Sequence, residues 1–163
     1  MKIRASLLLF LLLISFVKGH SQSTAYKTML SGIYEKDFPL VYIDQKDVLS
    51  KAILLDTREK EEFEVSHIKG ARWVGYDTFS LVSVKDIAKS EPIVVYCSVG
   101  ARSQDIGKKL KAAGYKEVYN LYGGIFHWVN EDRPVFSGQT TTNRIHTYNR
   151  IWSIWVNKGE KVY

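Results

Sequence analysis

Cys97, the only cysteine in the chain, stands where a thiol could carry out chemistry. It directly follows the apolar run Ile93–Tyr96, which predicts a buried strand, and it precedes a helix-forming segment that begins at Ala101. Open α/β sheets bind ligands at the carboxyl ends of their parallel strands. The spacing therefore places the sulfur at the edge of the sheet where a substrate would bind.

The turn between the strand and the helix is suited to an anion. It contains Gly100, which adopts conformations that other residues resist, and such a turn can aim successive backbone N–H groups inward. The start of the helix adds partial positive charge, and Arg102 adds a permanent cation. These features favour a thiolate, which is the nucleophilic form. A free cysteine can instead be only a small buried apolar side chain, but a strand, a glycine turn, an arginine and a helix together favour a working thiol.

The elements that would hold this turn alternate along the chain. Apolar runs predict strands, and segments with helical spacing or acid-rich composition predict the helices between them. This alternation predicts an α/β fold with a mostly parallel sheet. We expect strands at 41–43, 53–55, 71–76, 93–96 and 118–121, and helices at 26–34, 47–49 (after an N-cap at Asp44), 59–65, 83–89, 101–113 and 124–128.

The segment 137–163 has a different character, with a polar start followed by aromatic residues. Ile145, Tyr148 and Trp152 have helical spacing, although alternation from Trp152 onward would also suit a strand. We expect an extension that packs its aromatic side chains on the domain. The alternative is a tail that binds a partner or covers the active site.

Charge is concentrated outside the central part of the chain. Of the net charge of +6, residues 1–21 and residues 137–163 each contribute +3, whereas residues 22–136 hold equal numbers of basic and acidic side chains. A nucleic-acid-binding domain should carry a basic stripe on its folded surface. We therefore expect no nucleic-acid partner.

Residues 1–21 have the pattern of a cleavable signal peptide. Basic residues precede a short apolar run from Ala5 to Val17, and small residues follow at Gly19 and Ser21. A membrane anchor or a buried helix is the alternative, but the run is short for a membrane span. We expect export to the periplasm or the medium, with no stable membrane anchor after cleavage.

Four elements together resemble the rhodanese-type sulfurtransferases. The sequence Cys97-x-x-Gly100-x-Arg102-Ser103 resembles their active-site loop. The other elements are Asp56-Thr57-Arg58, Glu62-Phe63 with His67-Ile68-Lys69-Gly70-Ala71 (Ser66 replaces the usual Gly), and Leu121-Tyr122-Gly123-Gly124 with Trp128. The resemblance covers residues 41–136 and implies a single rhodanese domain, with a five-stranded parallel sheet flanked by helices, after a lead-in at 22–40.

The resemblance also implies roles for the residues. Cys97 would be the nucleophile, and His67 a structural residue and not a base. Arg102 could contact an anionic donor or pair with Asp56. Arg58 could line the pocket, lie on the surface or form an ion pair. The acidic residues 59–64 are interpreted as a solvated helix face. The candidate substrate-binding residues are Ser98, Val99, Gly100, Ala101, Arg102, Ser103 and Arg58, with Asp56 and His67 structural near the site.

The activity implied is transfer of a sulfane sulfur from thiosulfate or a persulfide donor, through a Cys97 persulfide, to a thiol or cyanide-like acceptor. No cofactor is expected, and the scattered histidines give no metal-ligand spacing. One alternative is a binding or sulfur-delivery module with a dedicated protein partner. The other is a cysteine-dependent phosphatase or arsenate reductase, but that loop resembles Cys-x5-Arg, whereas four residues separate Cys97 from Arg102.

Overall fold

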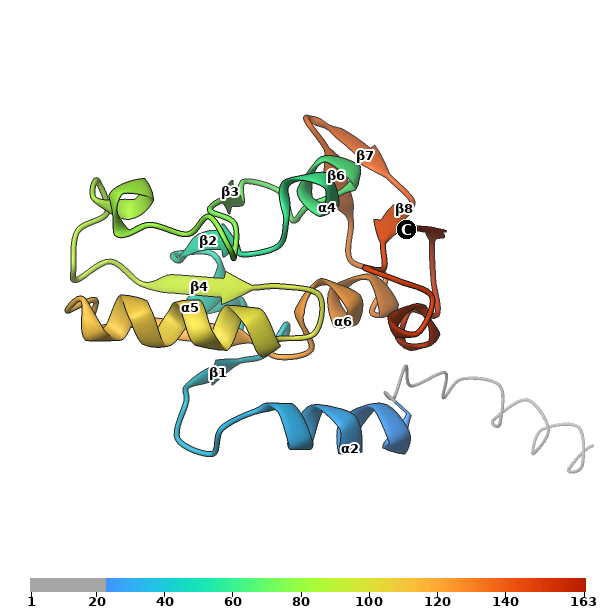
Figure 1. Cartoon of the computed structure of the whole chain (residues 1–163), viewed down its shortest axis with the longest axis horizontal. Helices are drawn as coiled ribbons and strands as arrows, with labels where there is room; N and C mark the ends of the chain where they lie inside the picture. The colour runs from blue at the N-terminus through green and yellow to red at the C-terminus, as the bar shows by residue number, and fades with distance from the viewer. Residues whose placement is uncertain (1–22) are drawn as a thin grey trace, which may run out of the picture.

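The computed structural model describes residues 23–163, and Figure 1 shows the path of the chain. The predicted signal peptide at 1–21 lies outside the described residues. A five-stranded, wholly parallel sheet has the order β1-β5-β4-β2-β3, which confirms the predicted fold class. Its strands are β1 (Leu40–Val41), β2 (Ile53–Asp56), β3 (Arg72–Trp73), β4 (Ile93–Tyr96) and β5 (Val118–Leu121).

Helices precede, connect and follow these strands. The α-helices are α2 (Thr24–Ile33), α3 (Lys46–Leu49), α4 (Lys60–Val65), α5 (Ala101–Ala112) and α6 (Gly124–Asn130), and a 3-10 helix, η2, spans Leu81–Val84. Within residues 23–163, no helix is both long enough and apolar enough to cross a bilayer.

The central strand β4 shows why the sheet is covered on both faces. All of its residues are buried, and successive side chains point to opposite faces. Val94 and Tyr96 join a core cluster with residues of α2 and α6, whereas Ile93 and Val95 join a second cluster with residues of α5 and η2. The continuous apolar run is therefore required by burial on both sides.

Apart from shifts of one or two residues at element ends, as for β1 (expected at 41–43), three predicted elements differ from the structure. The helix expected at 83–89 is the shorter η2, because the Val84 carbonyl accepts from Ile87 N–H (3.0 Å) and the Tyr115 hydroxyl (2.6 Å) and does not continue an α-helical ladder. The strand expected at 71–76 is only β3, since Gly75 has a left-handed φ of 72° that cannot continue a strand. Asp44 is not the N-cap of α3; Gln45 is, without a side-chain cap.

The segment after residue 134 folds against the domain. Its elements are the antiparallel pair β6 (Val135–Ser137) and β7 (Thr140–Thr142), the parallel pair β8 (Arg144–His146) and β9 (Glu160–Val162), and the 3-10 helix η3 (Trp152–Trp155). Ile145 and Val156 are buried in the same core cluster as α2 and α6. This segment, residues 135–163 and hereafter the tail, packs on the domain through short strands and one helical turn, and not through a single regular element.

Candidate active site

The first four carbonyl groups of the turn after β4 point outward, and each accepts a hydrogen bond from the surrounding fold. The carbonyls of Cys97 and Ser98 accept hydrogen bonds from the backbone N–H groups of residues 125 (2.9 Å) and 126 (3.1 Å) at the start of α6. The carbonyl of Val99 accepts from the Tyr34 hydroxyl (2.6 Å), and that of Gly100 accepts from Asn120 Nδ2 (2.8 Å).

These outward carbonyls determine what the turn presents to its interior. In a planar trans peptide the N–H and C=O point in opposite directions, so carbonyls turned outward leave N–H groups facing the other way. The Gly100 N–H donates to Cys97 Sγ at 3.1 Å, and the Cys97 residue is only 1% exposed. The sulfur therefore accepts from one backbone donor, and the outward carbonyls turn the neighbouring N–H groups toward the same interior at the start of α5. This arrangement, the cradle, is suited to an anionic sulfur species.

Two glycines are required by close approach. Gly100 has φ 112°, and a Cβ there would lie 2.4 Å from the Tyr34 hydroxyl oxygen. Gly124 has φ 55°, and a Cβ there would lie 2.3 Å from the Cys97 carbonyl oxygen. These glycines allow α2 and α6 to contact the cysteine turn directly.

Tyr34 and Asn120 fasten the turn to the rest of the fold. The Tyr34 hydroxyl donates to Val99 and accepts from the Gly123 N–H (2.7 Å), and burial raises its pKa so that it keeps its proton. Asn120 Oδ1 accepts from the buried Ser103 hydroxyl at 2.7 Å. Ser103, a predicted binding residue, thus does not line the cavity but orients Asn120, which holds the Gly100 carbonyl.

Arg102 pairs with Glu62 and not with Asp56. Its two terminal nitrogens donate to the Glu62 carboxylate at 2.7 and 2.9 Å, and Nη2 also donates to Ser98 Oγ at 3.1 Å. Burial would raise the pKa of Glu62, but the hydrogen bond and charge of Arg102 outweigh it and the pKa is lowered. The interpretation of the acids at 59–64 as a solvated face is wrong for Glu62, which is 2% exposed.

Arg58 does not line the turn. The Arg58 side chain is fully buried. Its Nη2 forms an ion pair with Asp56 Oδ2 (2.6 Å) and also donates to the Ser66 carbonyl (2.6 Å). Burial would lower its pKa, but the adjacent Asp56 charge outweighs this and the pKa is raised, so the guanidinium stays charged. Of the possibilities left open by the sequence for Arg58, the ion pair is the one observed.

His67 has a structural place. Its Nδ1 lies 3.0 Å from the Phe63 carbonyl, its ring stacks on the Phe63 ring, and its backbone pairs with Phe136 at the start of the tail. It connects α4 to the extension and does not line the cavity beside Cys97.

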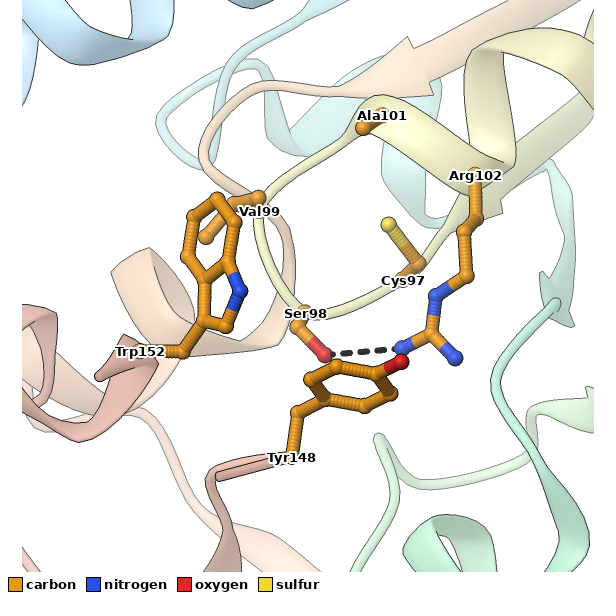
Figure 2. A pocket seen from close by; sticks show the side chains of 7 residues that line it. All are labelled: Cys97, Ser98, Val99, Ala101, Arg102, Tyr148 and Trp152. Carbon is orange, nitrogen blue, oxygen red and sulfur yellow. Dashed lines mark hydrogen bonds between the residues drawn. The ribbon is translucent and has the colours of Figure 1, made fainter. Parts of the chain in front are cut away.

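An open cavity of about 190 Å³ lies over the cysteine. Figure 2 shows the sulfur pointing into the ring traced by the turn, with Trp152 beside Val99 and the Tyr148 ring beside the Arg102 guanidinium. The tail therefore also covers the site, which the sequence left open as an alternative. The lining residues are Cys97, Ser98, Val99, Ala101, Arg102, Tyr148 and Trp152.

Sequence reasoning missed five contributors to this site. Some had a readable signal: Asn120 is a polar residue inside an apolar strand, and Glu62 stands three residues after Glu59, the spacing of the capping box that the structure contains. Tyr34, Tyr148 and Trp152 had no local signal for a role in the site, because their contacts depend on how distant segments pack.

The family assignment rests on a match over more than half of the sequence. The sequence model of the Rhodanese-like domain matches residues 42–131. The chain belongs to the rhodanese-like domain family. This rhodanese-like domain contains the whole cysteine turn, Glu62 and α6, whereas Tyr34 and the tail aromatics fall outside the matched range.

Individual relatives match about half of this chain. An uncharacterized protein, YqhL, of Bacillus subtilis is 37% identical over 78 residues, which cover 48% of this chain and 61% of that protein. The thiosulfate sulfurtransferase GlpE of Coxiella burnetii is 34% identical over 76 residues, 47% of this chain and 70% of that protein. The crystal structure of a thiosulfate sulfurtransferase from Pseudomonas aeruginosa superposes with a TM-score of 0.56 at 24% identity, covering 71% of this chain and 23% of that chain, and supports the fold.

Proposed function

We propose that this rhodanese-like domain is a sulfurtransferase that carries a sulfane sulfur as a persulfide on Cys97. The observation that carries the proposal is the cradle itself: four outward carbonyls, and a Gly100 N–H donating to Cys97 Sγ at 3.1 Å. Backbone donors aimed at a fixed sulfur stabilise negative charge on it, and on a second sulfur attached to it. Similarity to a thiosulfate sulfurtransferase supports the same chemistry.

The reaction has two half-reactions. The Cys97 thiolate attacks the outer sulfur of a donor such as thiosulfate, a new S–S bond forms, and sulfite leaves with the electron pair of the broken S–S bond. A thiol or cyanide-like acceptor then removes the outer sulfur and regenerates the thiolate. Covalent catalysis of this kind predicts ping-pong kinetics.

An intact-mass measurement tests the proposal. The purified protein is incubated with thiosulfate or a persulfide donor, beside a Cys97→Ser variant with the same circular dichroism. We expect a gain of one sulfur in the wild type alone, reversed by cyanide, and no turnover by the variant. Turnover by Cys97→Ser, or hydrolysis of phosphate esters without sulfur loading, would overturn the proposal.

We also propose that the protein is exported. The support is the sequence of residues 1–21, with its basic start, apolar run and small residues. The mass of the native protein from fractionated cells tests this: a chain shortened near Ser21 outside the cytoplasm is expected. A cytoplasmic pool of uncleaved protein would contradict export.

A further inference from the structure

One wall of the cavity over Cys97 is built from outside the family match. Tyr148 and Trp152 belong to the tail, whereas the match ends at residue 131. Apart from them, the lining above the sulfur includes the small apolar side chains of Val99 and Ala101. Figure 2 shows the indole and the phenol ring flanking the turn from the tail side.

The two aromatic side chains are held in place by the tail. Asn149 Oδ1 accepts from the N–H groups of Ile151 (3.0 Å) and Trp152 (3.1 Å), which begins η3. Tyr148 occupies a left-handed conformation with φ 64°, and its N–H donates to His146 Nδ1 at 3.1 Å.

The far end of η3 is fixed to α6. Asn130 Nδ2 donates to the Trp155 carbonyl (2.8 Å), and Asn130 Oδ1 accepts from the Asn157 N–H (2.7 Å). Because both ends of this short segment are bonded, the aromatic wall has a defined position relative to Cys97.

The charge of the cavity does not suit a free dianion. Arg102 is the one cation among the lining residues. Its guanidinium is already bonded by both terminal nitrogens to the buried Glu62 carboxylate, so its charge is compensated. Thiosulfate would have to exchange much of its hydration for hydrogen bonds from the backbone donors alone. Burying a charge without a counter-charge is costly.

We infer that the preferred donor is an organic sulfane-sulfur compound, a thiosulfonate or persulfide, whose apolar body packs against Trp152 and Tyr148. This inference rests on the proposed function and names its substrate class. The sulfane sulfur enters the N–H cradle, while the body replaces water on the aromatic wall. Aromatic bodies are favoured because they stack on aromatic rings and bury a large area.

The transfer step balances for such a donor. With a thiosulfonate, the Cys97 thiolate attacks the terminal sulfur, the Cys97 S–S bond forms and the S–S bond to the sulfonyl group breaks. The sulfinate leaves with that electron pair, and two negative charges are present before and after the step. No oxidant or reductant is needed.

Three donors test the inference with the full chain: benzenethiosulfonate, methanethiosulfonate and thiosulfate. Each kcat/KM with cyanide as acceptor is divided by the uncatalysed rate of the same donor with cyanide. Partial burial of the phenyl ring predicts that benzenethiosulfonate exceeds methanethiosulfonate by about tenfold, or ~1.4 kcal/mol, and thiosulfate by more.

Variants locate the preference. The preference is the ratio of kcat/KM for benzenethiosulfonate to kcat/KM for methanethiosulfonate. Trp152→Ala should bring this ratio close to one, and Tyr148→Ala should lower it by roughly threefold through loss of contact area. Tyr163→Ala is the matched control, because Tyr163 is 57% exposed against 53% for Tyr148, also belongs to the tail and does not line the cavity. It should leave the ratio unchanged.

The outcomes separate this inference from the proposed function. If Cys97 is loaded equally by all three donors, or if both variants keep the wild-type ratio, the inference is overturned while the sulfurtransferase proposal stands. If no donor loads Cys97, both are overturned. Because Tyr148 is half exposed, its variant keeps the test valid even if Trp152→Ala proves unstable.

Discussion

Replacing Glu62 by glutamine probes the link between the helix α4 and the cysteine turn. The Glu62 side chain is 2% exposed; it accepts two hydrogen bonds from Arg102 and one from the Ser98 hydroxyl, and it also accepts from the Glu59 N–H. Glutamine has nearly the same shape but no charge, and its amide nitrogen cannot accept from a guanidinium. The substitution therefore leaves Arg102 without its counter-charge.

The size of the effect follows from burial. Breaking a buried ion pair by removing one partner costs about 3–5 kcal/mol. The Arg102 side chain is 19% exposed and can regain some hydration, so we expect a loss of roughly 2–4 kcal/mol in the free energy of unfolding. Urea denaturation at pH 7 measures it, with Glu61→Gln as control: Glu61 is an exposed acid on the same helix, and its substitution should cost less than about 0.5 kcal/mol.

The same variant predicts a pH dependence. The pKa of Glu62 is lower in the folded protein than its usual value of 4.5, so the unfolded chain binds the proton more readily. Its contribution is complete above that usual value and is lost as pH falls through the lower native pKa. The stability gap between wild type and Glu62→Gln should therefore be constant from pH 7 to about 5 and narrow below about 4.5.

Two results would refute this reasoning. The first is a Glu62→Gln protein as stable as the Glu61→Gln control at pH 7, since the pair would then contribute nothing. The second is a gap that widens on acidification. If the freed Arg102 charge reaches the cavity, the variant should also gain in kcat/KM for thiosulfate relative to benzenethiosulfonate, which the same assays measure.

Two further substitutions test how the turn is held. Gly100→Ala should destabilise the protein by about 2–4 kcal/mol in urea denaturation, because its Cβ would lie 2.4 Å from the Tyr34 hydroxyl oxygen at a left-handed φ. Gly114→Ala is the control, because Gly114 is also left-handed but a Cβ there would face open space; it should cost only about 1–2 kcal/mol. Equal losses of stability in the two variants would exclude a clash with Tyr34 as the cause. Tyr34→Phe should cost about 1–3 kcal/mol and slow sulfur loading of Cys97 in the mass assay, because it strips partners from Val99 and Gly123; unchanged loading would show that the cradle does not depend on it.

Much of the fold was predictable because it depends on local patterns. The apolar runs at 93–96 and 118–121 indicated strands, and the helix at 101–113 ended within one residue of α5. For the helix expected at 83–89, a tertiary contact took part in the outcome, because the Tyr115 hydroxyl donates to the Val84 carbonyl.

The sequence by itself determined which residue can be the proposed nucleophile and where it stands in the chain. One cysteine, at the end of an apolar strand and before a glycine turn, leaves a single thiol for the chemistry. A permanent cation five positions later was equally visible, but its partner was not. The sequence offered Asp56 as a partner, and only packing shows that Asp56 is already held by Arg58 and that Arg102 pairs with Glu62.

The tertiary structure alone decided what surrounds the sulfur. The cradle depends on hydrogen bonds from Tyr34, Asn120 and the start of α6, and the aromatic wall depends on Tyr148 and Trp152. These residues are distant from Cys97 along the chain, and no local periodicity records which of them will meet. Their positions follow from sheet order and from the packing of α2 and the tail on the domain, because contacts between distant segments exist only once the chain is folded.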